Sequence, residues 1–421
     1  MERQGQALSA GGLHKKGWNY PATRHYTGNL HEPRTFRRMN AQDGTIAVVG
    51  GGPAGAMAGE RLARAGRHTL VLDEKLAWEK PCGGGVTPKA LLRYPYLREV
   101  AAERNWVTNC ELISPAGRRI CFPLSPPIAI FSRRVLNGLL LQRAQEAGAE
   151  IVQDRVLTIE GQPGAWRLRT RSGTQIAARY LILANGARSP FRSQFARPFT
   201  SGELLVSAGY YVPGSSPRMQ IRFLRNLDGY IWTFPRQDHL SAGIAGKIEG
   251  DWTAAKLRRE LEAFLEQEGL NYRGAQFYAH VIPSPNRETL RRTAFCGEGW
   301  ALVGDAAGLA DPITGEGIYY ALRSGELAAE ALLAGRPLAY RTMLAQDLLP
   351  ELAAAARYAG QFYHGNFLGQ PLLERMTQFM AESVRFRELM ADLFAGVQSY
   401  ISLHGRCYRL LLPELWNTVT S

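Results

Sequence analysis

The sequence lacks the features of a membrane-spanning, disulfide-stabilised or metal-binding protein. Its 421 residues contain no apolar run of 18 or more, so no transmembrane helix is predicted. The five cysteines are odd in number and scattered, and they indicate neither a disulfide framework nor paired metal ligands. The histidines are isolated, and none is assigned to a metal. A cytoplasmic location, in a reducing compartment, is therefore expected.

Acidic residues are scarce relative to basic ones. The chain has 50 Lys and Arg against 37 Asp and Glu, a net charge of +13. The basic residues are dispersed, and no recognition motif accompanies them, so nucleic acid is not an expected partner. Two interpretations stay open: peripheral contact with anionic lipids at the inner face of a membrane, or a solvated surface that maintains solubility.

Residues 1–44 show little apolar periodicity and are predicted to form a basic, disordered leader. They lack the apolar core of a secretory signal. Met39, just before the first predicted strand, offers an alternative start of the chain. No internal repeat is evident in the sequence.

Residues 45–74 have the pattern of a dinucleotide-binding βαβ unit. A buried strand over Ile46–Val49 precedes a G-x-G-x-x-G turn and an amphipathic helix. In such a turn the first glycine permits the bend, the second lets backbone approach a pyrophosphate, and the third lets helix and strand pack closely. The cofactor contacts predicted here are Gly50, Gly52, Pro53, Ala54 and Gly55.

The second strand of this unit, Leu70–Leu72, is followed directly by Asp73, 23 residues after Gly50. An acid at this position accepts a hydrogen bond from the ribose hydroxyl of an adenosine. No basic residue follows directly, which favours a 2′-hydroxyl over a 2′-phosphate. The unit therefore predicts FAD or NAD and does not separate the two.

Two later segments carry features that a flavin requires. Asn185–Ser189, NGARS, follows a buried strand over Tyr180–Ala184. In Leu302–Leu322, Asp305 follows a short strand and precedes a helix predicted over Gly315–Leu333. A carboxylate binds ribityl hydroxyls, and glycines and a helix N-terminus accommodate the ring and its negative charge. The contacts predicted here are Asp305, Gly315, Gly317 and Ile318.

Together these three segments resemble the para-hydroxybenzoate hydroxylase-like superfamily of FAD-dependent oxidoreductases, over roughly residues 45–333. Asn185 stands where that superfamily usually has aspartate. The resemblance implies FAD as the cofactor and a flavin-contacting role for Arg133, which begins a helix predicted over Arg133–Gly148. The alternative for Arg133 is an exposed arginine at a helix start. Further cofactor contacts implied by the resemblance are Gly83, Gly84 and Val156.

We expect an α/β (mixed α+β) fold, in which a Rossmann-like FAD-binding domain is interleaved with an antiparallel β-sheet substrate domain. The first domain covers residues 45–200 and 290–335, the second covers 201–289 with 91–131, and 336–421 form a helical C-terminal region. Within the second domain, a hairpin of Glu111–Ser114 and Arg119–Phe122 is expected to end at the proline-rich stretch PLSPP. One strand is expected over Ile151–Ile159.

Two further motifs narrow the resemblance to the geranylgeranyl reductase family. Lys80–Gly85, KPCGGG, and Gly229–Pro235, GYIWTFP, are similar to that family's cysteine loop and to its Y-x-W-x-F-P motif beside the flavin. Asp392–Leu403 is similar to the family's C-terminal part. The resemblance implies a reductase that saturates isolated C=C bonds of an isoprenoid chain. It implies catalytic roles for Cys82, Tyr230 and Trp232, and substrate contacts from Phe234 and Pro235.

An isolated double bond has no carbonyl to accept electron density, so its reduction needs a proton on one carbon and a hydride on the other. Reduced FAD can supply the hydride from N5, and an aromatic wall stabilises cationic character by about 1–2 kcal/mol per ring. The Cys82 thiol, a water or the flavin itself are the candidate proton donors. NAD(P)H or a ferredoxin is the expected electron donor.

Other interpretations stay open at this point. The aromatic residues of GYIWTFP alternate on one face of a strand and could be core, and Cys82 could be a small buried residue. The FAD scaffold also suits a monooxygenase, of the aromatic hydroxylase or epoxidase type, or a flavin halogenase. A flavin- and lipid-binding protein without turnover is a further alternative.

Overall fold

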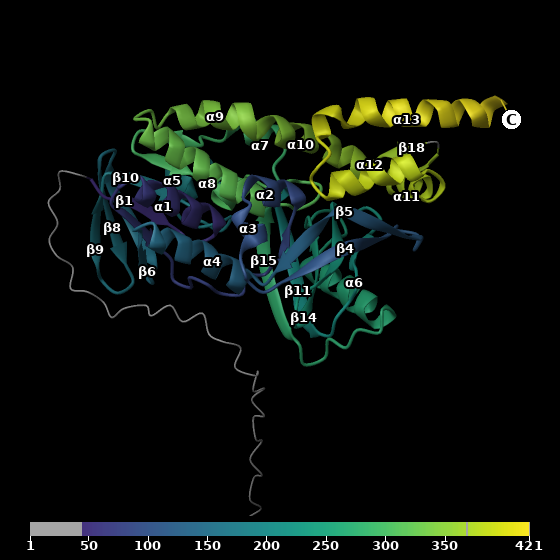
Figure 1. The fold of residues 1–421 in the computed structure, drawn as a ribbon, viewed down its shortest axis with the longest axis horizontal. Coiled ribbons are helices and arrows are strands. Elements are labelled where there is room, and N and C mark those ends of the chain that lie inside the picture. The colour runs from purple at the N-terminus through teal and green to yellow at the C-terminus, as the bar shows by residue number, and fades with distance from the viewer. Residues whose placement is uncertain (1–43, 368, 421) are drawn as a thin grey trace, which may run out of the picture. The chain divides into compact units, whose positions relative to one another are not determined.

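A six-stranded sheet carries the glycine turn near its centre (Figure 1). All neighbouring strands are parallel except the β16–β17 pair at one edge. The computed structural model describes residues 44–367 and 369–420, so the predicted leader lies outside the described residues except for Gly44. In spatial order the strands are β16 (Cys296–Gly297), β17 (Trp300–Leu302), β10 (Tyr180–Leu183), β1 (Ile46–Val49), β2 (Thr69–Leu72) and β6 (Glu150–Val152).

This sheet brings the three predicted flavin segments to one edge. Strands β1, β10 and β17 are adjacent and parallel, and the glycine turn, NGARS and the Asp305 segment follow their carboxyl ends. Ligands bind at this edge of open parallel sheets. Helix α1 (Pro53–Arg64) packs against α4 (Arg133–Glu146) and α8 (Ile318–Leu333), and a side chain at Gly325 of α8 would overlap with the backbone of Ala54.

A second, eight-stranded sheet matches the antiparallel sheet expected from the sequence, with one difference. Its strands β12 and β4 pair in parallel, while every other neighbouring pair is antiparallel. In spatial order they are β15 (Gln276–Pro283), β11 (Leu204–Pro213), β14 (His239–Gly246), β13 (Gly229–Pro235), β12 (Met219–Phe223), β4 (Arg104–Ile113), β5 (Arg119–Phe131) and β3 (Gly85–Val86). Helix α6 (Ala254–Gln267) packs on β11 and β14.

The hairpin expected to end before PLSPP is longer than predicted. Strand β5 runs through the prolines to Phe131. In the pairing of β5 with β4, Pro123 lies opposite Asn109, and Ile128 lies opposite Val107. The β5 residues 124–127 therefore stand against the single β4 residue Thr108 and form a bulge. A bulge leaves backbone groups outside the ladder, which is where proline, without an N–H, is tolerated in a strand.

The strand expected over Ile151–Ile159 is two strands. Strand β6 belongs to the six-stranded sheet, whereas β7 (Val156–Gln162) pairs with β8 (Ala165–Thr170), which in turn pairs with β9 (Gln175–Ala178). Asp154 separates β6 from β7, because its carboxylate accepts a hydrogen bond from the N–H of Arg155 and from the hydroxyl of Ser172. Local bonds of this kind compete with a continuous ladder.

The C-terminal helices pack against the larger sheet. Met376 and Met380 of α11 and Leu389 of α12 share a buried cluster with side chains of β4, β5 and β12, and Figure 1 shows these helices in yellow next to β5. The remaining elements are α2 (Pro88–Arg93), α3 (Tyr96–Glu99), α5 (Arg192–Phe195), α7 (Arg287–Arg292), α9 (Ala339–Asp347), α10 (Leu349–His364), β18 (Asn366–Phe367), β19 (Gln370–Pro371), α11 (Leu372–Glu382), α12 (Val384–Phe394) and α13 (Tyr400–Thr420).

No helix in residues 44–367 or 369–420 is long and apolar enough to cross a bilayer. Residues 39–421 form one compact unit, which contains both large sheets and the helical region. This unit is not divided at the domain boundaries predicted from the sequence, and those boundaries stay predictions.

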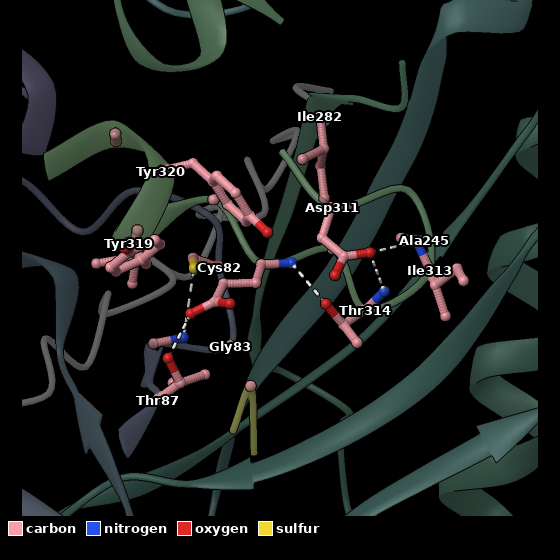
Figure 2. A pocket seen from close by; sticks show the side chains of 18 of the residues that line it. Cys82, Gly83, Thr87, Ala245, Ile282, Asp311, Ile313, Thr314, Tyr319 and Tyr320 are labelled. Atoms are coloured by element: carbon pink, nitrogen blue, oxygen red, sulfur yellow. Dashed lines mark hydrogen bonds between the residues drawn. The ribbon is translucent and has the colours of Figure 1, made fainter. Parts of the chain in front are cut away.

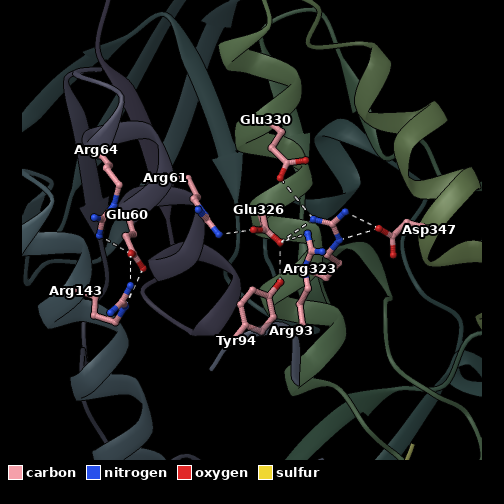
Figure 3. Close-up of polar contacts among 10 residues, drawn as sticks. All are labelled: Glu60, Arg61, Arg64, Arg93, Tyr94, Arg143, Arg323, Glu326, Glu330 and Asp347. Atoms are coloured by element: carbon pink, nitrogen blue, oxygen red, sulfur yellow. Dashed lines mark hydrogen bonds and ion pairs between the residues drawn. The ribbon is translucent and has the colours of Figure 1, made fainter. Parts of the chain in front are cut away.

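A buried polar network fixes α1 and α8 relative to α2 and α9 (Figure 3). The carboxylate of Glu326 on α8 accepts hydrogen bonds from Arg323 at 2.7 Å, from the hydroxyl of Tyr94 at 3.0 Å and from Arg61 of α1. Burial alone would raise the pKa of Glu326, but these partners outweigh it and lower the pKa. Arg323 also pairs with Asp347 of α9 at 2.6 Å. The helices around the glycine turn are therefore held rigidly.

Candidate active site

A cavity of about 590 Å³ is lined by strands of the eight-stranded sheet, by segments that follow strands of the six-stranded sheet, and by the C-terminal helical region. This volume is typical of small-molecule sites. Its walls include Gly52–Ala54, Lys80–Gly85, Thr314–Ala321 and Gly396–Tyr400. Figure 2 shows part of this lining, with Cys82, Thr314 and Tyr320 among the labelled residues. Segments that the sequence predicts separately as flavin and substrate contacts thus lie around one space.

The glycine turn leaves room for an anion at the N-terminus of α1. A side chain at Gly50, whose φ is +110°, would lie 2.5 Å from the carbonyl oxygen of Ala184, and one at Gly55 would overlap with Gly50. At Gly52, by contrast, an added Cβ would meet nothing within 4 Å. Gly52 is the N-cap of α1, which has no side-chain cap and no acid in its first turn. The uncapped helix N-terminus therefore fits a pyrophosphate.

Asp73 fastens the end of β2 to this turn. Its Oδ2 accepts a hydrogen bond from the N–H of Gly51 at 2.8 Å, and its Oδ1 accepts from the N–H groups of Lys75 and Leu76. Gly50, Gly55, Asp73, Val156 and Pro235 are not among the residues that line the cavity. Their direct contacts with cofactor or substrate stay predictions.

Arg133 lines the cavity and is only 4% exposed, so the alternative of an exposed arginine at a helix start is wrong. Its Nη2 donates to Oδ1 of Asn137 at 3.2 Å, and its buried Nε has no partner within the described chain. Arg133 forms no ion pair within the described residues, although its charge helps to lower the pKa of Asp305. A buried guanidinium with an unpartnered Nε fits an anionic group bound in the cavity. Ala184 and Gly186, around the NGARS turn, also line the cavity.

Asp305 lies in a short 3₁₀ turn, Gly304–Ala307, at the same wall. The ammonium of Lys80 donates to its Oδ2 at 3.0 Å. Burial alone would raise the pKa of Asp305, but Lys80 outweighs it, and the carboxyl is held in its charged form. His280 of β15 faces the same cavity, where burial and Lys80 lower its pKa to about 3, so the imidazole is neutral.

The aromatic strand and the cysteine loop are in contact at the cavity. Tyr230, Trp232 and Phe234 of β13 all line the cavity, with the Tyr230 and Trp232 ring centroids 6.2 Å apart. A Cβ at Gly83 would lie 2.5 Å from the Phe234 ring, and one at Gly315 would lie 3.1 Å from the Tyr230 hydroxyl. The aromatic residues therefore form a cavity wall between the cysteine loop and the Gly315–Gly317 turn, and Trp232 also packs in a buried hydrophobic cluster with Leu205 and Ala245.

Cys82 is half-buried at the cavity, and its backbone is fixed from β13 and β14. Its Sγ accepts a hydrogen bond from the N–H of Gly84 at 3.3 Å. Its carbonyl accepts from Nη2 of Arg236 at 2.7 Å and from the hydroxyl of Ser241 at 3.0 Å. Arg236 also pairs with Glu79. This positioning arginine was missed by sequence reasoning, although it directly follows GYIWTFP.

Glu316 and Gly396–Tyr400 also line the cavity. The sequence did not single out Glu316, and it matched Asp392–Leu403 to the family's C-terminal part without placing that segment at the cavity. The helix predicted from Gly315 begins only at Ile318, because Gly315 has φ +69° and cannot continue a helix. Glu316 therefore lies in the preceding turn, beside the cavity. The hydroxyl of Tyr400 donates to Oδ2 of Asp311 at 2.9 Å, which fastens the C-terminal segment to this turn.

Comparison with known proteins identifies the family. Residues 97–341 match the family model described as FAD dependent oxidoreductase. The chain belongs to this family. It is 27% identical over 348 residues to geranylgeranyl diphosphate reductase of Nicotiana tabacum, covering 76% of this chain and 72% of the relative. It is 31% identical over 307 residues to geranylgeranyl diphosphate reductase of Rhodobacter capsulatus, covering 68% and 74%.

Among solved structures, the fold is similar to a geranylgeranyl bacteriochlorophyll reductase-like protein from Thermoplasma acidophilum. The TM-score is 0.72 with 21% sequence identity, over 87% of this chain and 99% of the other. The predicted mixed α/β fold, the resemblance to geranylgeranyl reductases, the enzymatic nature of the chain and FAD as its cofactor are thereby confirmed. The open α1 N-terminus, Arg133, Asp305 and the Gly315–Gly317 turn are suited to hold FAD.

Proposed function

We propose that this FAD-dependent oxidoreductase saturates isolated C=C bonds of a prenyl chain. The observation that carries the proposal is the shared cavity, in which Trp232, Phe234 and the Cys82 loop face the turns suited to FAD. The geranylgeranyl diphosphate reductases among its relatives support this substrate class. When reduced, FAD supplies a hydride; NAD(P)H or a ferredoxin is the proposed source of its electrons.

The cavity residues are suited to the reduction of an isolated double bond. Tyr230 and Trp232 line the cavity, and their π faces can stabilise cationic character on the substrate carbon. Ile128, Ile221 and Phe223 extend the apolar lining, which excludes water that would otherwise capture the cation. Arg236 and Ser241 hold the Cys82 loop against Phe234, so the cysteine thiol has a fixed place at the wall.

The experiment that tests the proposal is anaerobic product analysis. Holoprotein reduced with dithionite and incubated with geranylgeranyl diphosphate should yield products heavier by two hydrogens for each saturated bond, detected by mass spectrometry. The monooxygenase alternative predicts no product without oxygen, and oxygen consumption in step with a product heavier by one oxygen. Recovery of unchanged lipid under both conditions would contradict the proposal and favour a flavin- and lipid-binding protein without turnover.

We propose further that the cavity opens toward an anionic membrane surface. Leu92 of α2 and Val397 both line the cavity, yet they are 71% and 49% exposed, so they lie at its opening. Ile401 is exposed close by in sequence, on the same helix as Arg406 and Arg409. Neither arginine forms an ion pair with an acid of the described chain. Apolar side chains with adjacent cations suit a surface of anionic lipid.

Replacing both Leu92 and Val397 by serine should weaken binding to vesicles that contain an anionic phospholipid by about tenfold, because two apolar side chains no longer insert. Sedimentation with vesicles measures this binding. Val384→Ser, at a side chain that is 58% exposed but outside the cavity lining, is the matched control and should leave binding unchanged. Equal vesicle binding by the wild type, the double variant and Val384→Ser would show that the membrane contact does not lie at the cavity opening.

A further inference from the structure

We propose that Glu316 delivers the proton to the double bond, an inference that rests on the proposed reductase activity. Glu316 lies between Gly315 and Gly317, just before the N-terminus of α8, and lines the same cavity as Cys82 and Tyr230. Glu316 is then the catalytic acid, and Cys82 contributes to the cavity wall without donating the proton.

The Glu316 carboxyl is held in place by its neighbours. The hydroxyl of Thr87, the N-cap residue of α2, donates to its Oε1. Its Oε2 lies 3.5 Å from the position that a Cβ on Gly396 would occupy, so the C-terminal segment lies against it. Its backbone carbonyl accepts a hydrogen bond from the N–H of Asp311 at 2.9 Å. Such anchoring fixes the direction in which a proton is presented.

No cation within the described chain forms an ion pair with Glu316. Among the other acids that line the cavity, Asp305 pairs with Lys80 and Asp347 pairs with Arg323. Asp311 and Glu351 form no ion pair with a cation of the described chain, but both accept hydrogen bonds from the C-terminal segment. The charged or titratable groups facing Glu316 are Asp311, Lys89, Tyr319 and Tyr320, and the Lys89 ammonium lies over the Tyr319 ring, 4.2 Å from its centroid. An uncompensated carboxyl in an enclosed apolar site favours its protonated form.

The balance of these effects gives a group suited to acid catalysis. Burial, the largest influence, and the nearby Asp311 raise the pKa of Glu316, while Thr87 and Lys89 oppose them, and the pKa lies at about 7. Asp311 is a poorer donor to substrate, since its oxygens already accept from the N–H groups of Ile313 and Thr314 and from the Tyr400 hydroxyl. A general acid acts best when its pKa is near the working pH.

The step balances with the reduced cofactor. The O–H bond of the Glu316 carboxyl breaks and a C–H bond forms at the less substituted olefin carbon, which leaves cationic character on the other carbon near Tyr230 and Trp232. FAD, when bound in its anionic reduced form, would supply the hydride and hence both electrons that this carbon receives. The Glu316 carboxylate then takes a proton from solvent before the next turnover.

Glu316→Gln tests the proposal, with Glu330→Gln as a matched control on the exposed part of α8. In anaerobic single turnovers with geranylgeranyl diphosphate, Glu316→Gln should slow flavin reoxidation by at least about 100-fold, the usual contribution of a general acid. FAD affinity and Glu330→Gln should be unchanged. The wild-type rate should fall as the pH rises through about 7. Thr87→Val removes a bond that lowers this pKa and should move that midpoint upward.

A measurement on the apoprotein tests the protonation of Glu316 without depending on turnover. The infrared carbonyl band of a protonated carboxyl should titrate near pH 7 in wild type and be absent from Glu316→Gln. If wild type itself forms no saturated product, the proposed function fails. If wild type does and Glu316→Gln reacts at the same rate with the same pH profile, the function stands and this inference is overturned.

Discussion

Replacing Gly52 by aspartate is expected to abolish FAD retention while leaving the protein folded. An added Cβ at Gly52 meets nothing within 4 Å, and the residue has extended backbone with φ −69°, so the substitution introduces neither a clash nor strain. The new carboxylate would cap α1, which has no side-chain cap, and would occupy the position suited to the pyrophosphate. The anion site at the helix N-terminus would then be filled by the protein's own charge.

Titration of the apoprotein with FAD, followed by flavin fluorescence, measures this effect. The dissociation constant should rise by at least about 100-fold, equivalent to about 2.7 kcal/mol. The thermal midpoint of the apoprotein should stay equal or increase, because an aspartate N-cap stabilises a helix. Gly52→Ala, which adds a methyl group without charge, should weaken binding less. Full FAD retention by Gly52→Asp would mean that the pyrophosphate lies elsewhere.

The second large effect is expected at Arg236. Its guanidinium is 1% exposed and bonds both to Glu79 and to the carbonyl of Cys82. Arg236→Met leaves the Glu79 carboxylate in a largely buried site with less compensation, and removing one member of a buried ion pair costs about 3–5 kcal/mol. The free energy of unfolding, from denaturant titration, should fall by this amount, and the Cys82 loop should lose its fixed position.

Two further variants test whether the unpaired Glu79 carboxylate causes the loss of stability in Arg236→Met. Glu79→Gln combined with Arg236→Met removes both charges and should recover part of the stability. Arg171→Met removes an exposed partner of Glu74 and should cost at most about 1 kcal/mol. Burial alone would raise the pKa of Glu79, but Arg236 and the hydroxyl of Ser132 lower it. The Glu79 contribution to stability is therefore present above the ordinary carboxyl pKa and lost as the pH falls through the lowered one. A small cost for Arg236→Met would contradict this assignment.

The parts of the site built from neighbouring residues were predictable from the sequence. The glycine turn, the strands that flank it and the position of Asp73 all lie within 30 residues, where spacing and apolar pattern determine the structure. The βαβ unit was therefore predicted with nearly correct bounds. The resemblance to a known family supplied what spacing alone could not: the prediction that two distant motifs, KPCGGG and GYIWTFP, belong to one site, and both line the same cavity.

The rest depends on contacts between residues far apart in the chain. Arg236 matters because the β13–β14 hairpin places it 2.7 Å from the carbonyl of Cys82, 154 residues away in sequence. Glu316 stands out only once its contact with Gly396 and its lack of an ion-pair partner among the described residues are known. The extent of β5 was missed because its bulge depends on register with β4, which no local pattern specifies.

The most direct test of the account follows the flavin absorbance near roughly 450 nm, a general property of oxidised flavins. Holoprotein is reduced with dithionite without oxygen and mixed with geranylgeranyl diphosphate. If one cavity holds FAD and the prenyl chain together, the absorbance returns in proportion to the bonds saturated. Absorbance that stays bleached, with the lipid chemically unchanged, would contradict the account.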